Sequence, residues 1–267
     1  MTSNHRFSLA LDSLSELKLQ AAPTDPPVEI THSQPITAAS KRSGILDELG
    51  PLPRGALFLG MASDGFPVLL NLYDPHPGPM LITGETGSGK TTFLKSIAQS
   101  VLQTQQESDV QFGVITTHVE EWSDIQKTRH LVGVFDVNQS SAQELISSLA
   151  SWAHSNKDAQ QIVLLLVDDL ESIARSDFEA LQNFRWLLLR GPARRVWPII
   201  TMSAERYGQV LAWIEIFRTR IFGQIANTRV AEALGGDKAS ALAELEAGKE
   251  FSLRENGNWL RFTIPNF

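Results

Sequence analysis

The fold of this chain is decided by one stretch of sequence, Gly84-Glu85-Thr86-Gly87-Ser88-Gly89-Lys90-Thr91. It fits the pattern G-x-x-x-x-G-K-[ST], and it directly follows the apolar run 80–83. A strand that enters a glycine-rich turn and leaves as a helix directs several backbone N–H groups at one point, where the helix dipole also favours an anion. Apolar residues then recur at helical spacing, at Phe93, Leu94, Ile97, Ala98, Val101 and Leu102. The sequence therefore predicts a phosphate-binding loop between a strand and a helix.

Each residue type in this loop has a chemical reason. Side chains at the glycine positions would block the approach of the backbone to phosphate. Lys90 is expected to reach the β- and γ-phosphates of ATP, and the Thr91 hydroxyl is expected to bind Mg²⁺. The predicted nucleotide-binding residues are Gly84, Glu85, Thr86, Gly87, Ser88, Gly89, Lys90, Thr91 and Thr92.

A second signal lies further along the chain, where the apolar run 162–167 ends in Asp168 and Asp169. An apolar strand that ends in acidic residues downstream of a P-loop is the Walker B arrangement, which predicts Asp168 as a ligand of Mg²⁺. Asp169 stands where hydrolytic P-loop enzymes usually place a glutamate that polarises the attacking water. Glu171 could share this role. A site that binds nucleotide without hydrolysing it, and so acts as a switch, remains an alternative.

Two weaker signals concern a residue that senses the γ-phosphate and an arginine that completes the nucleotide site. The run 199–203 predicts a strand, and Ser203 or Thr201 at its end could sense the γ-phosphate, although a plain strand end is the alternative. An arginine could act on the nucleotide of a neighbouring subunit, or could simply be a solvated surface residue. The candidates are Arg190, Arg194, Arg195, Arg218 and Arg220, of which Arg195 and Arg220 are taken as site residues.

Strand and helix patterns alternate along the rest of the chain, which is typical of an α/β fold with a mainly parallel central sheet flanked by helices. Hairpins are expected at 56–72, leading into the P-loop strand, and at 250–264. Ser176 and Glu179 predict the start of a helix that ends near Arg190. The remaining expected strands are 112–117, 131–135, 196–201 and 221–225, with further helices after Ser140 and over 227–234.

Composition limits the class of protein. The chain has 267 residues, a net charge of −7 and no cysteine, which excludes disulfides, thiolate metal sites and a cysteine nucleophile. No apolar stretch approaches the roughly 20 residues that cross a bilayer, so we expect no membrane insertion and a cytoplasmic location. Because the charge is negative, binding to nucleic acid would need local basic clusters or an assembly that concentrates them. Residues 1–45 are rich in Pro, Ser and Thr, which predicts a flexible arm or linker, or an element on which a partner protein docks.

Several of these stretches together resemble the ATPase core of the FtsK/HerA superfamily, over about residues 52–255. The stretches that carry the resemblance are 64–68, 79–91, 168–169, 199–203, 219–221 and 233–236. Two positions depart from the family pattern, which usually has glutamate at Asp169 and glutamine at Ser203. These departures put the rate of hydrolysis and its sensing in question.

The resemblance implies a RecA-like P-loop ATPase domain over 46–267. It also implies hydrolysis of ATP at the interface of a homo-oligomer, expected to be a hexameric ring, that translocates double-stranded DNA. Four alternatives stay open at this point: a coupling ATPase that moves protein in a secretion machine, a viral-type genome-packaging ATPase, a nucleotide-dependent assembly switch, and a small-molecule kinase.

Overall fold

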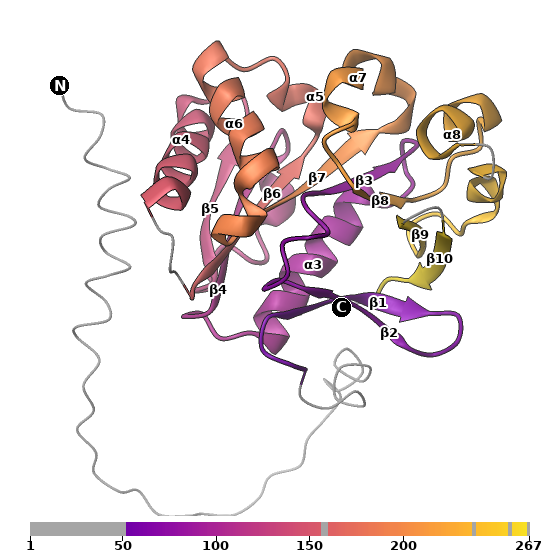
Figure 1. Cartoon of the computed structure of the whole chain (residues 1–267), viewed down its shortest axis with the longest axis horizontal. Helices are drawn as coiled ribbons and strands as arrows, with labels where there is room; N and C mark the ends of the chain where they lie inside the picture. The colour runs from indigo at the N-terminus through magenta and orange to yellow at the C-terminus, as the bar shows by residue number, and fades with distance from the viewer. Residues whose placement is uncertain (1–51, 156–159, 237–238, 256–257, 266–267) are drawn as a thin grey trace, which may run out of the picture. The chain divides into compact units, whose positions relative to one another are not determined.

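The computed structural model describes residues 52–155, 160–236, 239–255 and 258–265 (Figure 1). The expected arm at 1–45 and the expected turn at 256–257 lie outside these residues. The described strands form one ten-stranded sheet in which six neighbouring strands are parallel. In their order across the sheet the parallel strands are β8 (Thr219–Phe222), β3 (Met80–Gly84), β7 (Val196–Ser203), β6 (Ile162–Asp168), β4 (Val110–Thr116) and β5 (Leu131–Asp136). The predicted α/β fold with a mainly parallel sheet is confirmed.

The other four strands are antiparallel and extend the sheet beyond β8. They are, from the edge inward, β2 (Pro67–Asn71), β1 (Ala56–Ala62), β10 (Asn258–Thr263) and β9 (Glu250–Glu255). Both predicted hairpins form, as β1–β2 and as β9–β10. The first hairpin precedes the P-loop strand in sequence, but in the sheet three strands separate β1 from β3. The two hairpins pair with each other through β1 and β10, a contact between distant parts of the chain that no local pattern encodes.

Helices cover both faces of the parallel strands. Alternate strand residues point to opposite faces, and in β4 Phe112 belongs to the core cluster that contains Ile97 of α3, whereas Gly113 lies against Leu145 of α4. Helix α3 therefore covers one face, and α4, with α6 beside it, covers the other (Figure 1). The longer helices are α3 (Lys90–Thr104), α4 (Ser140–Ser155), α6 (Phe178–Arg190) and α8 (Thr228–Gly235). The short ones are η1 (Val119–Trp122), α5 (Leu170–Ile173), η2 (Pro192–Arg194), η3 (Ala204–Gln209), α7 (Leu211–Ile214) and η4 (Ala239–Glu244).

The predicted start of α6 was displaced by one residue. Its N-cap is Asp177, whose carboxylate accepts a hydrogen bond from the backbone N–H of Ala180 at 2.8 Å. Ser176 was the expected cap, but aspartate caps a helix as well as serine does and also favours the positive end of the helix dipole.

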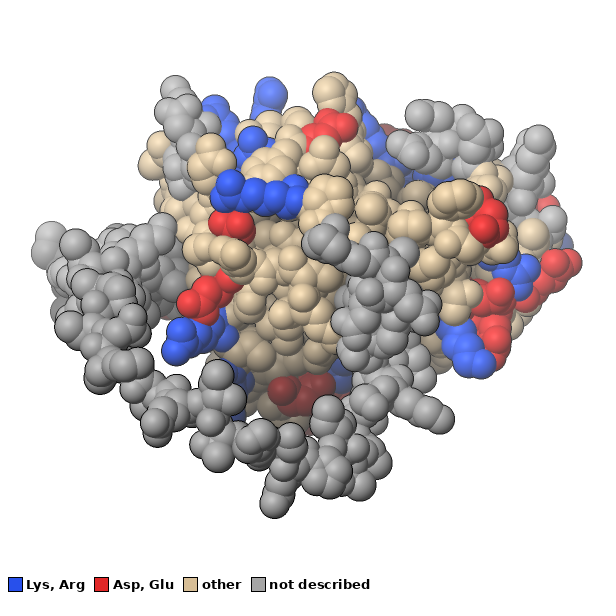
Figure 2. Space-filling model, turned by 90° about the horizontal axis from the view of Figure 1, so that it is seen from below, with Lys and Arg blue, Asp and Glu red and all other residues tan. Residues whose placement is uncertain are grey.

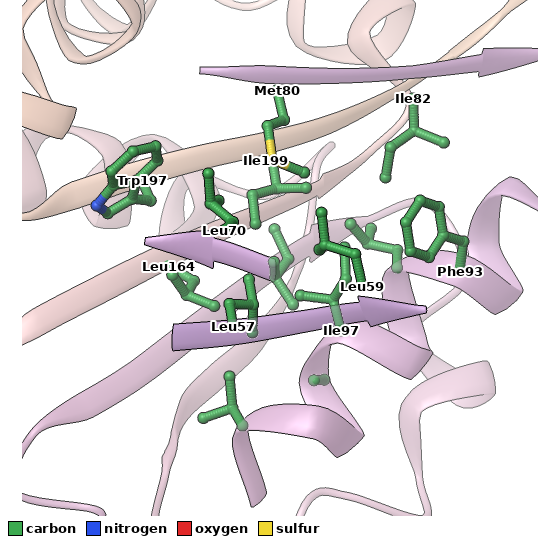
Figure 3. Packing of buried hydrophobic residues seen from close by; sticks show 14 of the residues in the cluster. Leu57, Leu59, Leu70, Met80, Ile82, Phe93, Ile97, Leu164, Trp197 and Ile199 are labelled. Carbon is green, nitrogen blue, oxygen red and sulfur yellow. The ribbon is translucent and has the colours of Figure 1, made fainter. Parts of the chain in front are cut away.

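The core on the α3 side joins the parallel strands to the two hairpins. Residues from β1, β2, β3, β6, β7 and α3 meet there (Figure 3). Phe93 of α3 packs against Phe251 of β9 and Phe262 of β10, with ring centroids 4.7 Å and 5.8 Å apart. Burial of each such side chain contributes about 1.5–3 kcal/mol. The first turn of the P-loop helix is thus fixed by the C-terminal hairpin.

The surface carries both signs of charge. In the view of Figure 2, basic and acidic side chains are interspersed around a largely uncharged middle, and neither sign forms a continuous patch. Among the described residues, no helix combines the length and the hydropathy that a membrane span needs.

Candidate nucleotide-binding site

The loop between β3 and α3 has the backbone that its glycines predict. Gly87 and Gly89 have φ angles of +81° and +89°, which side chains with a Cβ rarely adopt. Gly89 also lies against the backbone of another loop, since a Cβ there would be 2.5 Å from the Cα of Gly248. Helix α3 begins directly at Lys90, so its first N–H groups face the loop.

Lys90 lies at the centre of this site. Its Nζ donates hydrogen bonds to the carbonyl oxygens of Gly84 at 3.0 Å and Glu85 at 2.9 Å. Burial lowers the pKa of Lys90, and nearby carboxylates oppose this effect. They are, in decreasing order, those of Asp169, Asp168, Glu171 and Glu205. The ammonium group therefore faces acidic residues from the ends of two other strands.

Asp168 connects the P-loop to the neighbouring strands. Its Oδ2 accepts a hydrogen bond from Thr91 Oγ1 at 2.9 Å, and its Oδ1 accepts one from Thr201 Oγ1 at 2.8 Å. Burial raises the pKa of Asp168, and these two hydroxyl groups oppose the rise. Because β7 lies between β3 and β6, Thr201 can contact the end of β6, and its oxygen also accepts from the backbone N–H of Asp169 at 2.9 Å.

This arrangement fits a magnesium ion. Mg²⁺ prefers hard oxygen ligands, and the Thr91 hydroxyl and the Asp168 carboxylate bring such oxygens within hydrogen-bond distance of each other. Within the described residues, no three His, Cys, Asp or Glu side chains form a cluster that could hold a metal. Mg²⁺ at this position would therefore need oxygens of ATP and water as its other ligands, as is usual for this ion.

Asp169 has a strained backbone. Its φ of 101° lies in the left-handed region, which costs a residue other than glycine about 1–3 kcal/mol. The hydrogen bond from its N–H to Thr201 helps to hold this conformation. Such strain is concentrated at functional sites, and here it occurs at the residue that the sequence predicts to orient water.

Glu171 is the most deeply buried carboxylate at the site. Its side chain is 2% exposed, and its Oε1 accepts a hydrogen bond from the backbone N–H of Ser203 at 2.9 Å. Its Oε2 is buried and has no hydrogen-bond partner among the described residues. Burial raises the pKa of Glu171 from an ordinary 4.5 to about 7, and the neighbouring Asp169 carboxylate adds to the rise. Glu171 therefore changes its charge near neutral pH.

We expect a pH-dependent stability from Glu171. A raised pKa in the folded state means that the stabilising contribution is complete below pH 4.5 and is lost as the pH rises through about 7. Glu171→Gln stays neutral, so the free energy of unfolding of the wild type relative to the variant should fall by at most about 3 kcal/mol over this range. Urea unfolding at pH 5, 6, 7 and 8 measures this difference, with the exposed α6 residue Glu179→Gln as control. A difference that does not change with pH would contradict the prediction.

Glu205 is a site residue that the sequence did not indicate. Its Oε2 accepts from Thr86 Oγ1 in the P-loop at 3.2 Å and from Ser203 Oγ at 3.5 Å. It thereby connects the P-loop to the end of β7. Two other loops also donate hydrogen bonds to the P-loop. The N–H of Gly248 donates to the Ser88 carbonyl at 3.1 Å, and the N–H of Asn227 donates to the Glu85 carboxylate at 3.0 Å. The contacts of Thr86 with Glu205, of Ser88 with Gly248 and of Glu85 with Asn227 join residues far apart in sequence, so no motif could have predicted them.

Comparison with known proteins agrees with this geometry. A family model for the NACHT domain matches residues 78–221, more than half of the 267 residues. This chain belongs to the NACHT domain family. The matched part of this NACHT domain begins just before β3 and ends within β8, so it contains the P-loop, the acidic end of β6 and Ser203. No curated protein matches the sequence significantly.

Solved structures share the fold of this NACHT domain. ATPases 2 and 3 of EccC from Thermomonospora curvata, in complex with a signal sequence peptide, match at a TM-score of 0.66 and 17% identity, over 92% of this chain and 46% of theirs. ATPases 2 and 3 of EssC from Geobacillus thermodenitrificans match at 0.68 and 11%, over 90% and 48%. The chain thus spans about half the length of these structures. The pCW3 conjugation coupling protein TcpA, solved with ATPγS, matches at 0.60 and 15%, over 82% and 68%. At such identities the matches show a shared P-loop NTPase fold.

The two candidate arginines lie apart from the site of their own NACHT domain. Arg195 directly precedes β7, at the opposite end of the strand from Ser203, and its guanidinium donates to the Tyr73 carbonyl at 3.1 Å and lies over the Tyr73 ring. Arg220 donates to the carbonyls of Phe217, Ile214 and Leu234 at 3.1–3.2 Å. A role for Arg220 on a neighbouring subunit would require these three bonds to break. A role in trans for either arginine stays a prediction.

Thr92 is also set apart from the polar contacts of the site. It lies exposed in the first turn of α3. The remaining predicted residues are placed together: the P-loop, Asp168, Asp169, Glu171 and Ser203 all lie at the edge formed by the carboxyl ends of the parallel strands.

Proposed function

We propose that the chain is an ATP-hydrolysing motor of the FtsK/HerA type that works as a homo-oligomer and acts on double-stranded DNA. The observation that carries the catalytic part is the 2.9 Å contact between Thr91 and Asp168, which joins the P-loop to an acidic strand end. Such a pair of oxygens, next to a lysine and a glycine loop, is the set that Mg²⁺–ATP needs. Residues 46–267 would form the ATPase domain, and residues 1–45 would be an arm on which a partner docks.

In this proposal each residue at the site has a distinct task. Lys90 would exchange its contacts with the Gly84 and Glu85 carbonyls for oxygens of the β- and γ-phosphates. Thr91 and Asp168 would hold Mg²⁺, which neutralises charge on the phosphates when bound. Ser203, which contacts the P-loop through Glu205, would sense the γ-phosphate. Water would attack the γ-phosphate in line, oriented by Asp169 or Glu171.

The two candidate carboxylates differ in environment. Glu171 has a pKa of about 7, close to the value at which a base is most effective at neutral pH, but one of its oxygens is engaged by Ser203 N–H. Asp169 is only partly buried and shorter than the usual glutamate by one methylene. A rate of turnover that rises with pH through about 7 would indicate Glu171.

Asp169→Glu tests the other carboxylate. If Asp169 orients water from too far away, the longer side chain should raise the steady-state ATPase rate, by about 10-fold if it recovers 1.4 kcal/mol of transition-state stabilisation. The control is Asp136→Glu, since Asp136 ends β5, which is separated from β6 by β4, at the same edge of the sheet. An unchanged or lower rate would exclude Asp169 as a weakened catalytic position.

Two kinds of cargo are compatible with this fold. A conjugation coupling protein and a type VII secretion ATPase both share it. DNA is the first candidate, because the sequence resembles the FtsK/HerA superfamily. Protein is the second candidate, because the chain is acidic overall and the related EccC structure contains a signal sequence peptide.

ATPase assays distinguish these proposals. Stimulation by duplex DNA that weakens steeply as salt rises would support the DNA motor, since phosphate contacts release counterions. Stimulation by an unfolded polypeptide, with indifference to DNA, would support protein cargo. ATP turnover that no polymer changes would refute the motor while leaving the ATPase intact, and absence of any Mg²⁺-dependent nucleotide binding would refute both.

A further inference from the structure

The carboxylate of Glu205 accepts hydrogen bonds from two hydroxyl groups that belong to different elements of the site. Its Oε2 lies 3.2 Å from Oγ1 of Thr86, in the P-loop, and 3.5 Å from Oγ of Ser203, at the end of β7. Ser203 is the direct partner of Gly84, the first residue of the P-loop, in the parallel pairing of β7 with β3. One negatively charged oxygen therefore contacts donors from both the P-loop and the end of β7.

The proposed ATPase needs these same donors for the γ-phosphate. Lys90 would reach the β- and γ-phosphates, and Ser203 would sense the γ-phosphate. The Glu205 carboxylate also acts on Lys90, whose pKa it raises against the lowering effect of burial. A carboxylate and a phosphate accept the same charge-assisted hydrogen bonds, and two such anions repel each other when they are close. Glu205 and a γ-phosphate would therefore exclude each other from this position.

The side chain of Glu205 can leave the position without disturbing the core. It is exposed, whereas the preceding residue, Ala204, is fully buried. The backbone N–H of Ser203 donates to the buried carboxylate of Glu171, which holds the end of β7 in place. Rotation of the Glu205 side chain towards solvent would thus release the Thr86 and Ser203 hydroxyls and leave the backbone where it is.

We infer that Glu205 competes with the γ-phosphate of ATP for the hydroxyl groups of Thr86 and Ser203, so that the site discriminates between nucleoside triphosphate and diphosphate. The inference rests on the proposed ATPase and adds a means of regulation to its site. ATP has to displace the carboxylate before its γ-phosphate can bind. ADP has no γ-phosphate and leaves the carboxylate in place. Glu205 thereby lowers the affinity for ATP relative to the affinity for ADP.

Glu205→Gln tests this competition, because glutamine has nearly the same shape and keeps an oxygen that can accept from Thr86, but carries no charge. ATP should bind to the variant about 10-fold more tightly, a factor within the range that Coulomb's law gives for neighbouring charges between water and a partly buried site. The affinity for ADP should change much less. Both affinities are measured by isothermal titration calorimetry with Mg²⁺, using ADP and a non-hydrolysable ATP analogue.

Salt separates electrostatic competition from a change in local structure. Dissolved ions screen the repulsion between exposed charges, so the difference in ATP affinity between the wild type and Glu205→Gln should narrow as NaCl rises from about 0.05 M to about 0.5 M. The matched control is Glu107→Gln, which removes the same charge from an exposed position before β4, at the opposite edge of the sheet from the P-loop. This control should bind both nucleotides as the wild type does.

Three results would overturn the inference while the proposed ATPase stands. The first is weaker binding of ATP to Glu205→Gln, since the carboxylate would then help to hold Mg²⁺–ATP. The second is an unchanged affinity for ATP, or an equal change for ATP and ADP. The third is a difference in ATP affinity that salt does not reduce. A wild type that binds neither nucleotide would refute the proposed function, and this inference with it.

Discussion

Lys90→Ala is expected to lower ATP turnover on the order of 10²–10³-fold, the loss that follows removal of one preorganised group that stabilises transition-state charge. Lys90 is the cation that the carboxylates of Asp168, Asp169, Glu171 and Glu205 surround. Without it, these carboxylates would face the triphosphate with no ammonium group between them. Nucleotide affinity should fall together with turnover, as measured by titration with a fluorescent ATP analogue and by phosphate release.

Lys95→Ala is the matched control for this prediction. Lys95 lies in the same helix, pairs with Glu121 at 3.8 Å and has a side chain that is 30% exposed. Its loss should change turnover much less than the loss of Lys90. If Lys90→Ala keeps normal affinity and turnover, the P-loop assignment is wrong.

Asp168→Asn is expected to lower Mg²⁺-dependent hydrolysis strongly while the fold is kept. Asparagine has nearly the same shape and keeps one oxygen to accept from Thr91 or Thr201, but it has no negative charge for Mg²⁺. Because burial raises the pKa of Asp168, the carboxylate costs stability at neutral pH. A neutral side chain removes this cost, so the free energy of unfolding at pH 7 should stay the same or rise.

The measurement combines ATPase rates over a range of Mg²⁺ concentrations with urea unfolding. Turnover should drop on the order of 100-fold at limiting Mg²⁺, at the upper end of the losses seen when a metal site is perturbed. The control is Asp136→Asn, since Asp136 ends β5 at the same edge of the sheet as Asp168. This variant should keep both turnover and Mg²⁺ dependence. Hydrolysis that persists unchanged in Asp168→Asn would exclude Asp168 as a metal ligand.

The sequence could predict the parts of this site that lie within one local unit. A strand, a glycine turn and a helix follow each other over 80–104, and glycine is needed at positions 87 and 89 because of their positive φ angles. The apolar run 162–167 predicts a buried strand with Asp168 at its end. The strands and helices expected from periodicity are found with ends displaced by a few residues, because periodicity reports the buried face and the ends depend on capping and turns.

The sequence could not predict contacts that depend on the order of strands. The insertion of β7 between β3 and β6 is what brings Thr201 against Asp168 and Asp169. Glu205 lies two residues after β7 and belongs to no recognisable sequence motif. The approach of Gly248 to the P-loop depends on how the second hairpin packs. These features follow from tertiary packing, in which the loops at one sheet edge come from distant parts of the chain.

The pairing of β1 with β10 has a consequence for biosynthesis. Strand β1 can form a hairpin with β2 as soon as both have left the ribosome, but its other edge waits until β10, which lies much further along the chain, has been translated. A nascent or prematurely terminated polypeptide would therefore present an open, apolar strand edge, which invites aggregation. Production of this protein in cells should accordingly be sensitive to chaperone supply and to stop codons that fall between β9 and β10.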